Sequence, residues 1–222
     1  MTKNPLLALV AALVFIQIGP AFADRVQHPP KYNPGTATTP EEAQKRLLKS
    51  LKSKGITELP LSEPRIVIEK SKRQLSLYNG ETLIKTFHVD LGRAPNGPKQ
   101  QQGDYRTPEG VFHIVKRSDV SNFHLFLGLN YPNSSAADQA LNQRKISKAL
   151  RDQIVVSEQK KTIPPWNTKL GGAVGIHGVG KGRSLVRKFG KDWTAGCIAL
   201  TDSEIEEIWV ATNQWTPVEI KQ

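Results

Sequence analysis

The sequence of 222 residues contains a single cysteine, Cys197, so it cannot form a disulfide within the chain. Its five histidines are scattered, and none stands with the cysteine at a spacing typical of metal ligands, which argues against a metal site. There are no internal repeats, and no segment after residue 23 is apolar enough to span a bilayer. The lone thiol is therefore either a small buried hydrophobe or a nucleophile that works with a nearby histidine.

The first 23 residues are typical of a secretory signal peptide. Lys3 supplies a basic start, residues 6–18 are apolar except for Gln17, and Ala21-Phe22-Ala23 fits a cleavage site. The apolar run is shorter than the roughly 20 residues that a membrane-spanning helix needs. We expect cleavage after Ala23, a periplasmic protein, and no transmembrane anchor in the mature chain.

The chain is strongly basic, with a formal net charge of +11 that falls to +10 when the signal segment, whose only charged residue is Lys3, is removed. Such a surface favours anionic partners. Export makes nucleic acid an unexpected partner, whereas a bacterial cell wall offers peptide carboxylates and anionic polymers. The alternative is that the excess of lysine serves only solubility.

Local patterns divide the chain into three parts. Residues 24–40 are rich in Pro, Gly, Thr and Asn and predict a tether. A helix is expected to start at Thr39-Pro40 and to stop before Gly55, with its apolar stripe packed on the main domain. From Arg65 the pattern changes to strands. The expected division is thus a signal peptide (1–23), a tether with a short helix (24–64) and a main domain (65–221).

Short apolar or alternating runs predict strands in the third part. Asn79-Gly80 predicts a hairpin turn, residues 136–152 predict one helix, and Thr201 with Glu204 forms a capping box that begins another. The loop 92–108 is too long and polar for a simple turn and is expected to edge a site. The predicted strands are 66–68, 74–78, 83–91, 111–115, 123–129, 172–176 and 217–220. Together these patterns predict a mostly-β domain with a few peripheral helices and an N-terminal helical extension.

Cys197 and His177 are the candidate catalytic pair. A free thiol is only a few per cent thiolate at neutral pH, so it needs a base or a positive environment. The imidazole of His177 would accept the thiol proton and later protonate a leaving amine. The remaining histidines are predicted to lie in the tether (His28) or within strands (His88, His113 and His124) and to have no catalytic role; for His124 the alternative is that it lines the cleft.

Glycines and a threonine surround this pair. The carbonyl of Gly178 is placed to orient the His177 ring, and the N–H groups of Gly196 and Cys197 are candidates for an oxyanion hole. Gly196 would let a substrate carbonyl approach the backbone closely. Thr194 offers a hydroxyl to the substrate. The alternative is that these glycines only mark tight turns.

These residues carry a resemblance to a known family. Ile176-His177-Gly178, followed by Thr194-Ala195-Gly196-Cys197-Ile198, resembles the signature of L,D-transpeptidases with the YkuD-type catalytic domain. The run from Gly103 to Gly110 resembles the family's G-D-x-x-T-P-x-G segment, and residues 129–133 resemble a feature of one proteobacterial branch. The resemblance covers residues 65–221, in order, and implies a β-sandwich-like catalytic domain.

Two positions depart from the family pattern. Many members have a histidine where this chain has Ala195, and an arginine or asparagine where it has Ala199. The Cys–His pair depends on neither position, but the substrate-carboxylate contact given to that arginine does. Arg183 or Arg187, between His177 and Cys197, is the candidate replacement, and the alternative for both is solvated surface charge.

The resemblance implies a specific reaction without cofactor or metal. The Cys197 thiolate would attack the carbonyl of the third residue of a peptidoglycan tetrapeptide stem, release D-alanine and form a thioester, and carbapenems would acylate the same thiol. An amine of a second stem would then yield a 3→3 cross-link, and a lysine of an envelope protein would yield an anchored protein. Two alternatives remain: hydrolysis on the same scaffold (carboxypeptidase, endopeptidase or peptidoglycan–protein amidase) and an inactive wall-binding module.

Overall fold

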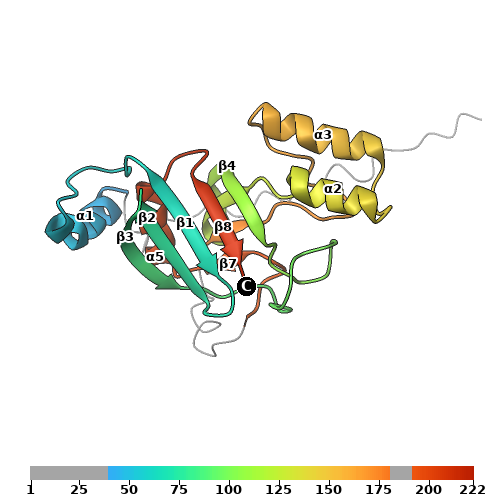
Figure 1. The fold of residues 1–222 in the computed structure, drawn as a ribbon. Coiled ribbons are helices and arrows are strands. Elements are labelled where there is room, and N and C mark those ends of the chain that lie inside the picture. Colours follow the sequence, from blue (N-terminus) through green and yellow to red (C-terminus); the bar gives the residue numbers. More distant parts are fainter. Residues whose placement is uncertain (1–39, 181–191) are drawn as a thin grey trace, which may run out of the picture.

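The computed structural model describes residues 40–180 and 192–222, and in them eight strands form one mixed sheet. The order across the sheet is β3-β2-β1-β8-β4-β5-β6-β7. The strands are β1 (Pro64–Glu69), β2 (Gln74–Asn79), β3 (Thr82–His88), β4 (Gly110–Ser121), β5 (His124–Leu129), β6 (Gly175–His177), β7 (Ile198–Ala199) and β8 (Pro217–Lys221). The helices are α1 (Pro40–Leu51), the 3-10 turn η1 (Lys52–Lys54), α2 (Ser134–Asn142), α3 (Lys148–Gln159) and α5 (Asp202–Ala211). The expected mostly-β fold with peripheral helices and an N-terminal helix is confirmed (Figure 1).

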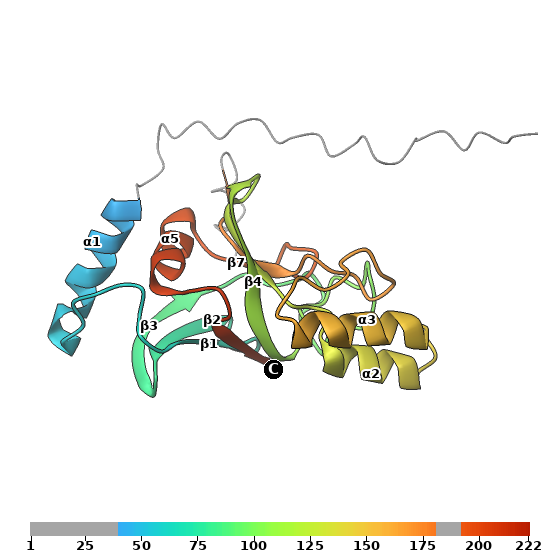
Figure 2. The same ribbon diagram turned by 90° about the horizontal axis from the view of Figure 1, so that it is seen from above.

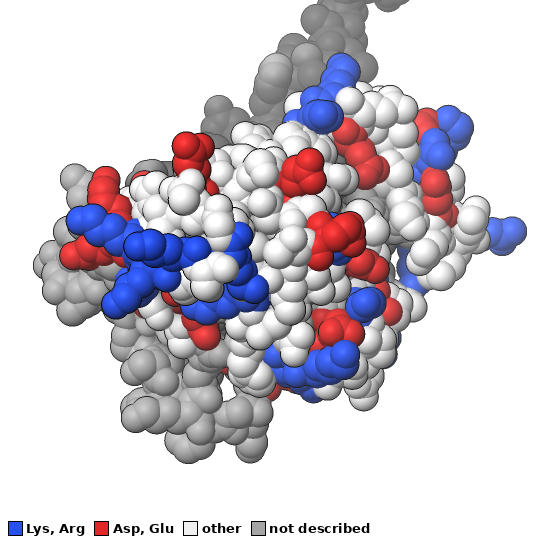
Figure 3. All heavy atoms as spheres, turned by 60° about the vertical axis from the view of Figure 1, so that its left-hand side comes forward, with Lys and Arg blue, Asp and Glu red and all other residues white. Residues whose placement is uncertain are grey.

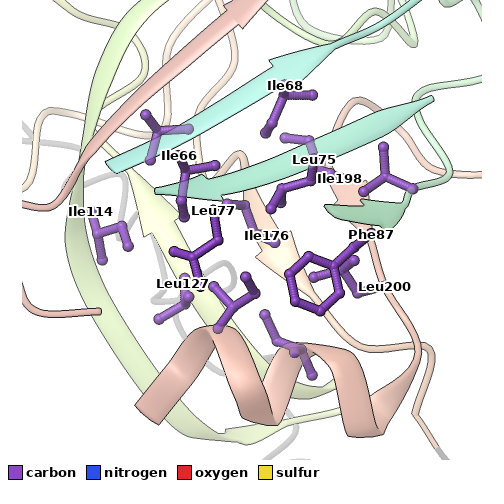
Figure 4. Packing of buried hydrophobic residues seen from close by; sticks show 14 of the residues in the cluster. Ile66, Ile68, Leu75, Leu77, Phe87, Ile114, Leu127, Ile176, Ile198 and Leu200 are labelled. Carbon is purple, nitrogen blue, oxygen red and sulfur yellow. The ribbon is translucent and has the colours of Figure 1, made fainter. Parts of the chain in front are cut away.

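The sheet is curled around a single main core. Strands from both ends of the sheet order contribute to one buried cluster, which a flat sheet could not achieve. Figure 4 shows side chains of this cluster, among them Leu75, Leu77, Ile176 and Ile198, pointing toward one another above a helix. Burial of these aliphatic residues, at about 25 cal/mol per Å² of apolar surface, is the main force that closes the sheet.

Helices cover two ends of the sheet (Figure 2). α1 packs on α5 through Ala43, Leu47 and Leu51, which are all buried, as its apolar stripe predicts. Gly55 follows η1 in the left-handed conformation, with φ of 68°. The α2–α3 hairpin lies at the opposite end and has a small core of its own. None of the helices in residues 40–180 and 192–222 has the length and apolarity to cross a bilayer.

The predicted single helix over 136–152 is wrong. The segment forms α2 and α3, separated at residues 143–147, where Arg144 adopts a φ of +58° and Ser147 caps the second helix by accepting a hydrogen bond from the Leu150 N–H. A residue with positive φ cannot continue a right-handed helix. The side chain of Ser147 then starts a new one.

The surface carries charges of both signs. On the face in Figure 3, lysine and arginine side chains gather in groups, with aspartates and glutamates interspersed between them. The attraction to anionic partners stays a prediction from the net charge.

Candidate active site

Strands β6 and β7 place His177 and Cys197 on the same face of the sheet. The two strands pair in parallel, with Ile176 opposite Ile198 and His177 opposite Ala199. Both isoleucines are fully buried in the core (Figure 4). Side chains alternate along a strand, so His177 and the residue preceding β7, Cys197, project from the other face. The register therefore places the two candidate catalytic residues on one face of neighbouring strands.

The His177 ring is fixed by its own turn. Its Nδ1 lies 2.6 Å from the Gly178 carbonyl oxygen. A carbonyl only accepts, so Nδ1 carries a proton and Nε2 is the basic nitrogen of the neutral ring. The ring is 3% exposed and packs against Phe123 and Trp193, with centroids 4.5 Å and 5.8 Å away. The contact expected between Gly178 and His177 is thus present, and its catalytic role stays a prediction.

Gly178 has no room for a side chain. A Cβ built there would lie 2.4 Å from Asp202 Oδ1 and 2.8 Å from the Phe123 carbonyl oxygen. Packing therefore requires glycine at this position, next to the histidine.

The Cys197 sulfur lies against backbone. Sγ is 3.7 Å from the Ala173 carbonyl oxygen, and the residue is only partly exposed. Burial raises the pKa of the Cys197 thiol, while a backbone hydrogen bond from Gly175 and the positive charge of Lys99 act in the lowering direction, and the net shift is upward. A thiol of this kind needs a base to become a nucleophile.

The turn before Cys197 uses the Thr194 hydroxyl internally. Thr194 Oγ1 accepts from the Gly196 N–H at 3.0 Å and donates to the Cys197 carbonyl oxygen at 2.7 Å. The residue is 4% exposed. The hydroxyl therefore stabilises the turn, whereas the sequence predicted a substrate contact, and the Gly196 N–H predicted for an oxyanion hole is already engaged.

A glycine is required at position 196 because another segment of the backbone approaches it closely. Its φ is +134°, and a Cβ built there would lie 2.6 Å from the Arg106 carbonyl oxygen. The sequence predicted that a substrate carbonyl needs this space. In the structure the backbone of the loop 92–108 lies where this Cβ would be, and the approach of a substrate carbonyl stays a prediction.

That loop edges the candidate site. Gly92 meets the same turn: a Cβ there would lie 2.1 Å from the Tyr105 carbonyl oxygen and 3.1 Å from Gly196 Cα. The Arg93 N–H donates to the Thr194 carbonyl at 3.1 Å. The loop expected to border a site is therefore packed directly on the cysteine turn.

Two lysines of this region were not singled out in the sequence. Lys70, at the end of β1, is fully buried; its Nζ donates to the carbonyl oxygens of Gly97 and Thr107 at 2.8 and 3.1 Å and pairs with Glu109 at 2.8 Å. Lys99 lies within the loop itself, buried beside Gly196. Lysines are usually exposed, so a sequence gives no signal that these two are inside.

Lys70 is expected to hold the loop in place, and Lys70→Met should lower the free energy of unfolding by about 2–3 kcal/mol. The substitution removes the donor of the Gly97 and Thr107 carbonyl oxygens and the ion-pair partner of Glu109. Urea unfolding measures the effect, with Lys72→Met as the control, since the Lys72 side chain is 62% exposed and its ion pair with Glu69 should contribute less than about 1 kcal/mol. Equal effects of the two substitutions would contradict this role for Lys70.

Three other histidines contact neighbours of their own. His88 is largely exposed near Asp90, His113 stacks on Trp215, and His124 forms a buried contact of 2.9 Å with Glu206. Ala199 is fully buried opposite His177, so it offers no contact to a substrate carboxylate. The signal segment, the tether up to residue 39, Arg183 and Arg187 lie outside the described residues.

The model of the YkuD family, described as the L,D-transpeptidase catalytic domain, matches residues 63–220. A search of curated protein sequences returns no match.

Solved structures with a similar fold are distant in sequence. The helical cell shape determining protein Pgp2 from Campylobacter jejuni is 18% identical, with a TM-score of 0.45, over 74% of this chain and 49% of that one. Bd1075 from Bdellovibrio bacteriovorus is 20% identical, with a TM-score of 0.43, over 72% and 48% of the two chains. L,D-transpeptidase 1 of Mycobacterium tuberculosis is 12% identical, with a TM-score of 0.37, over 72% and 62%. The present chain spans about half the length of the first two proteins.

Proposed function

The chain belongs to the YkuD family of L,D-transpeptidase catalytic domains, and from this premise we propose that it is a periplasmic cysteine acyltransferase acting on peptidoglycan stem peptides. The observation that carries the proposal is the parallel pairing of β6 and β7, which sets Cys197 and His177 on one face. The Gly178 carbonyl supports the same assignment, because it leaves Nε2 as the basic nitrogen of His177.

In the proposed acylation step, His177 Nε2 takes the proton of the Cys197 thiol. The thiolate attacks the carbonyl of the third stem residue, and the C–N bond to D-alanine breaks. The imidazolium returns the proton to the leaving amine, so the products are a thioester on Cys197 and free D-alanine. The Cys197 N–H is our candidate for stabilising the oxyanion, since the Gly196 N–H donates to Thr194.

In the second step an amine attacks the thioester and gives up its proton to His177. The C–S bond breaks, the new amide forms, and the thiolate regains a proton from the imidazolium. A side-chain amine of a second stem gives a 3→3 cross-link, and a lysine of an envelope protein gives an anchored protein. Water as the acceptor gives net hydrolysis.

Incubation of the purified protein with tetrapeptide muropeptides tests the proposal. We expect cross-linked dimers and free D-alanine, detected by liquid chromatography and mass spectrometry. Tripeptides without dimers would indicate that the protein is a hydrolase and not a transferase. Unchanged muropeptides, with the protein retained on sacculi, would indicate an inactive wall-binding module.

A further inference from the structure

Lys99 buries a positive charge beside the cysteine turn, and the reaction proposed above gives it no role. Its side chain is 4% exposed, and Nζ lies 2.7 Å from Asp104 Oδ1 and 3.0 Å from the Gln101 carbonyl oxygen. An ammonium group has three donors, and these contacts account for two of them. Burial of such a group carries a large desolvation penalty, so a merely space-filling position would favour an apolar side chain.

Two glycines flank the path of this side chain. A Cβ built on Gly171 would lie 3.1 Å from Lys99 Cε, and one built on Gly196 would lie 3.8 Å from Lys99 Nζ. Gly171 and Gly196 have φ values of +84° and +134°, where other residues are strained. The lysine stem thus passes beside backbone without side chains, and its charge ends next to the residue that precedes Cys197.

Asp104 balances this charge only in part. Besides Lys99, it accepts the backbone N–H groups of Gln100, Gln101 and Arg106, at 2.7, 3.0 and 3.1 Å. Burial opposes the ionisation of Asp104, but Lys99 and these three hydrogen bonds hold the pKa of its carboxyl below the usual range. The carboxylate therefore divides its interactions between the ammonium and the backbone, and Lys99 acts on the Cys197 thiol as a positive charge.

We infer that Lys99 is a positioning residue whose buried ammonium, held by Asp104 between two glycines, stabilises the Cys197 thiolate. The inference rests on the proposed function, because it concerns the reactivity of the same cysteine. The titratable groups that bear on the Cys197 thiol in the described part of the chain are Lys99 from the loop, Asp104, which holds the Lys99 ammonium, and His177, which the register of β6 and β7 sets on the same face. Among them Lys99 is the fixed cation, and its charge opposes the rise in the pKa of the thiol that burial causes.

Alkylation by iodoacetamide, an uncharged reagent, tests the inference across a range of pH. Cys197 is the only cysteine, so the modified fraction reports on it alone. The rate follows the thiolate fraction and rises as the pH rises through the thiol pKa. With Lys99→Met the midpoint of this curve should move to higher pH, and the rate at pH 7 should fall about tenfold.

Lys145→Met is the matched control. Lys145 donates to Gln100 Oε1 at 3.1 Å, so the control removes the same charge from a lysine that contacts the same loop, and the curve should stay in place. A midpoint for folded Lys99→Met that coincides with the wild type would overturn the inference. So would an equal shift in Lys145→Met.

Asp104→Asn provides a second variant that keeps the lysine. It removes the counter-ion of Lys99, so the midpoint should move to lower pH, opposite to Lys99→Met; a midpoint that stays or rises would contradict the inference. Alkylation needs no turnover. A shift without any transpeptidation would therefore uphold the role of Lys99 while the proposed function fails.

Discussion

Cys197→Ala is expected to reduce the formation of muropeptide dimers by about 10⁴-fold or more, to the background rate. Alanine has no atom that can form the thioester, so both proposed steps are lost. The fold should survive, because the residue is partly exposed and the contact of its sulfur with the Ala173 carbonyl oxygen is long, at 3.7 Å. Dimer yield over time, with thermal unfolding of both proteins measured in parallel, checks the prediction.

Cys197→Ser serves as the matched control for shape. It keeps the size of the side chain and a hydrogen-bonding group, but a hydroxyl ionises far less readily than a thiol. We expect Cys197→Ser to be nearly as inactive as the alanine variant. Full activity of the alanine variant would rule out the cysteine mechanism.

Replacement of His177 is expected to have the second largest effect. His177→Gln should slow acylation by about 10³-fold at pH 7, because a thiol whose pKa burial raises would have no base to take its proton. The loss should shrink as the pH rises, since hydroxide then generates the thiolate without the imidazole. Burst kinetics of D-alanine release between pH 7 and 9.5 measure this.

His88→Gln is the control for the loss of a histidine, because the His88 side chain is 58% exposed at the end of β3. It should retain nearly all activity. A loss in His177→Gln that does not change with pH, or that matches the loss in His88→Gln, would contradict a role for His177 as the base. Thermal unfolding of His177→Gln shows whether the loss of activity comes instead from lost packing against Phe123 and Trp193.

Features set by neighbouring residues could be predicted from the sequence. Asn79-Gly80 forms the turn between β2 and β3, with Gly80 at a φ of +56°. Thr201 and Glu204 form the capping box of α5. Both depend on chemistry within four residues, so the pattern contains all the information that the structure uses.

Features set by distant segments could not be predicted in the same way. The break between α2 and α3 depends on the conformation of Arg144, for which a short-range pattern gives little warning, although Ser147 is a recognisable cap. The strand expected over 172–176 begins only at Gly175, because β6 extends only as far as its partners do.

The candidate site shows the same division. The sequence pairs Cys197 with His177 and places Gly178 beside the ring; the strand register sets the first two on one face, and the Gly178 carbonyl contacts the ring. The sequence predicts substrate contacts for Thr194 and Gly196. It does not show that the Gly196 N–H donates to the Thr194 hydroxyl, as it does in the structure. The position of Lys99 beside Gly171 and Gly196 could not be predicted from the sequence, because it depends on how the loop 92–108 folds.

The central claim is that Cys197 is an acyl-accepting nucleophile. Intact-protein mass spectrometry after exposure to a carbapenem, whose strained lactam carbonyl stands in for the scissile amide, tests it most directly. We predict one adduct per wild-type molecule, mapped by peptide analysis to Cys197, and none on Cys197→Ala. A folded wild-type protein without an adduct, or an adduct that persists in the alanine variant, would contradict the claim.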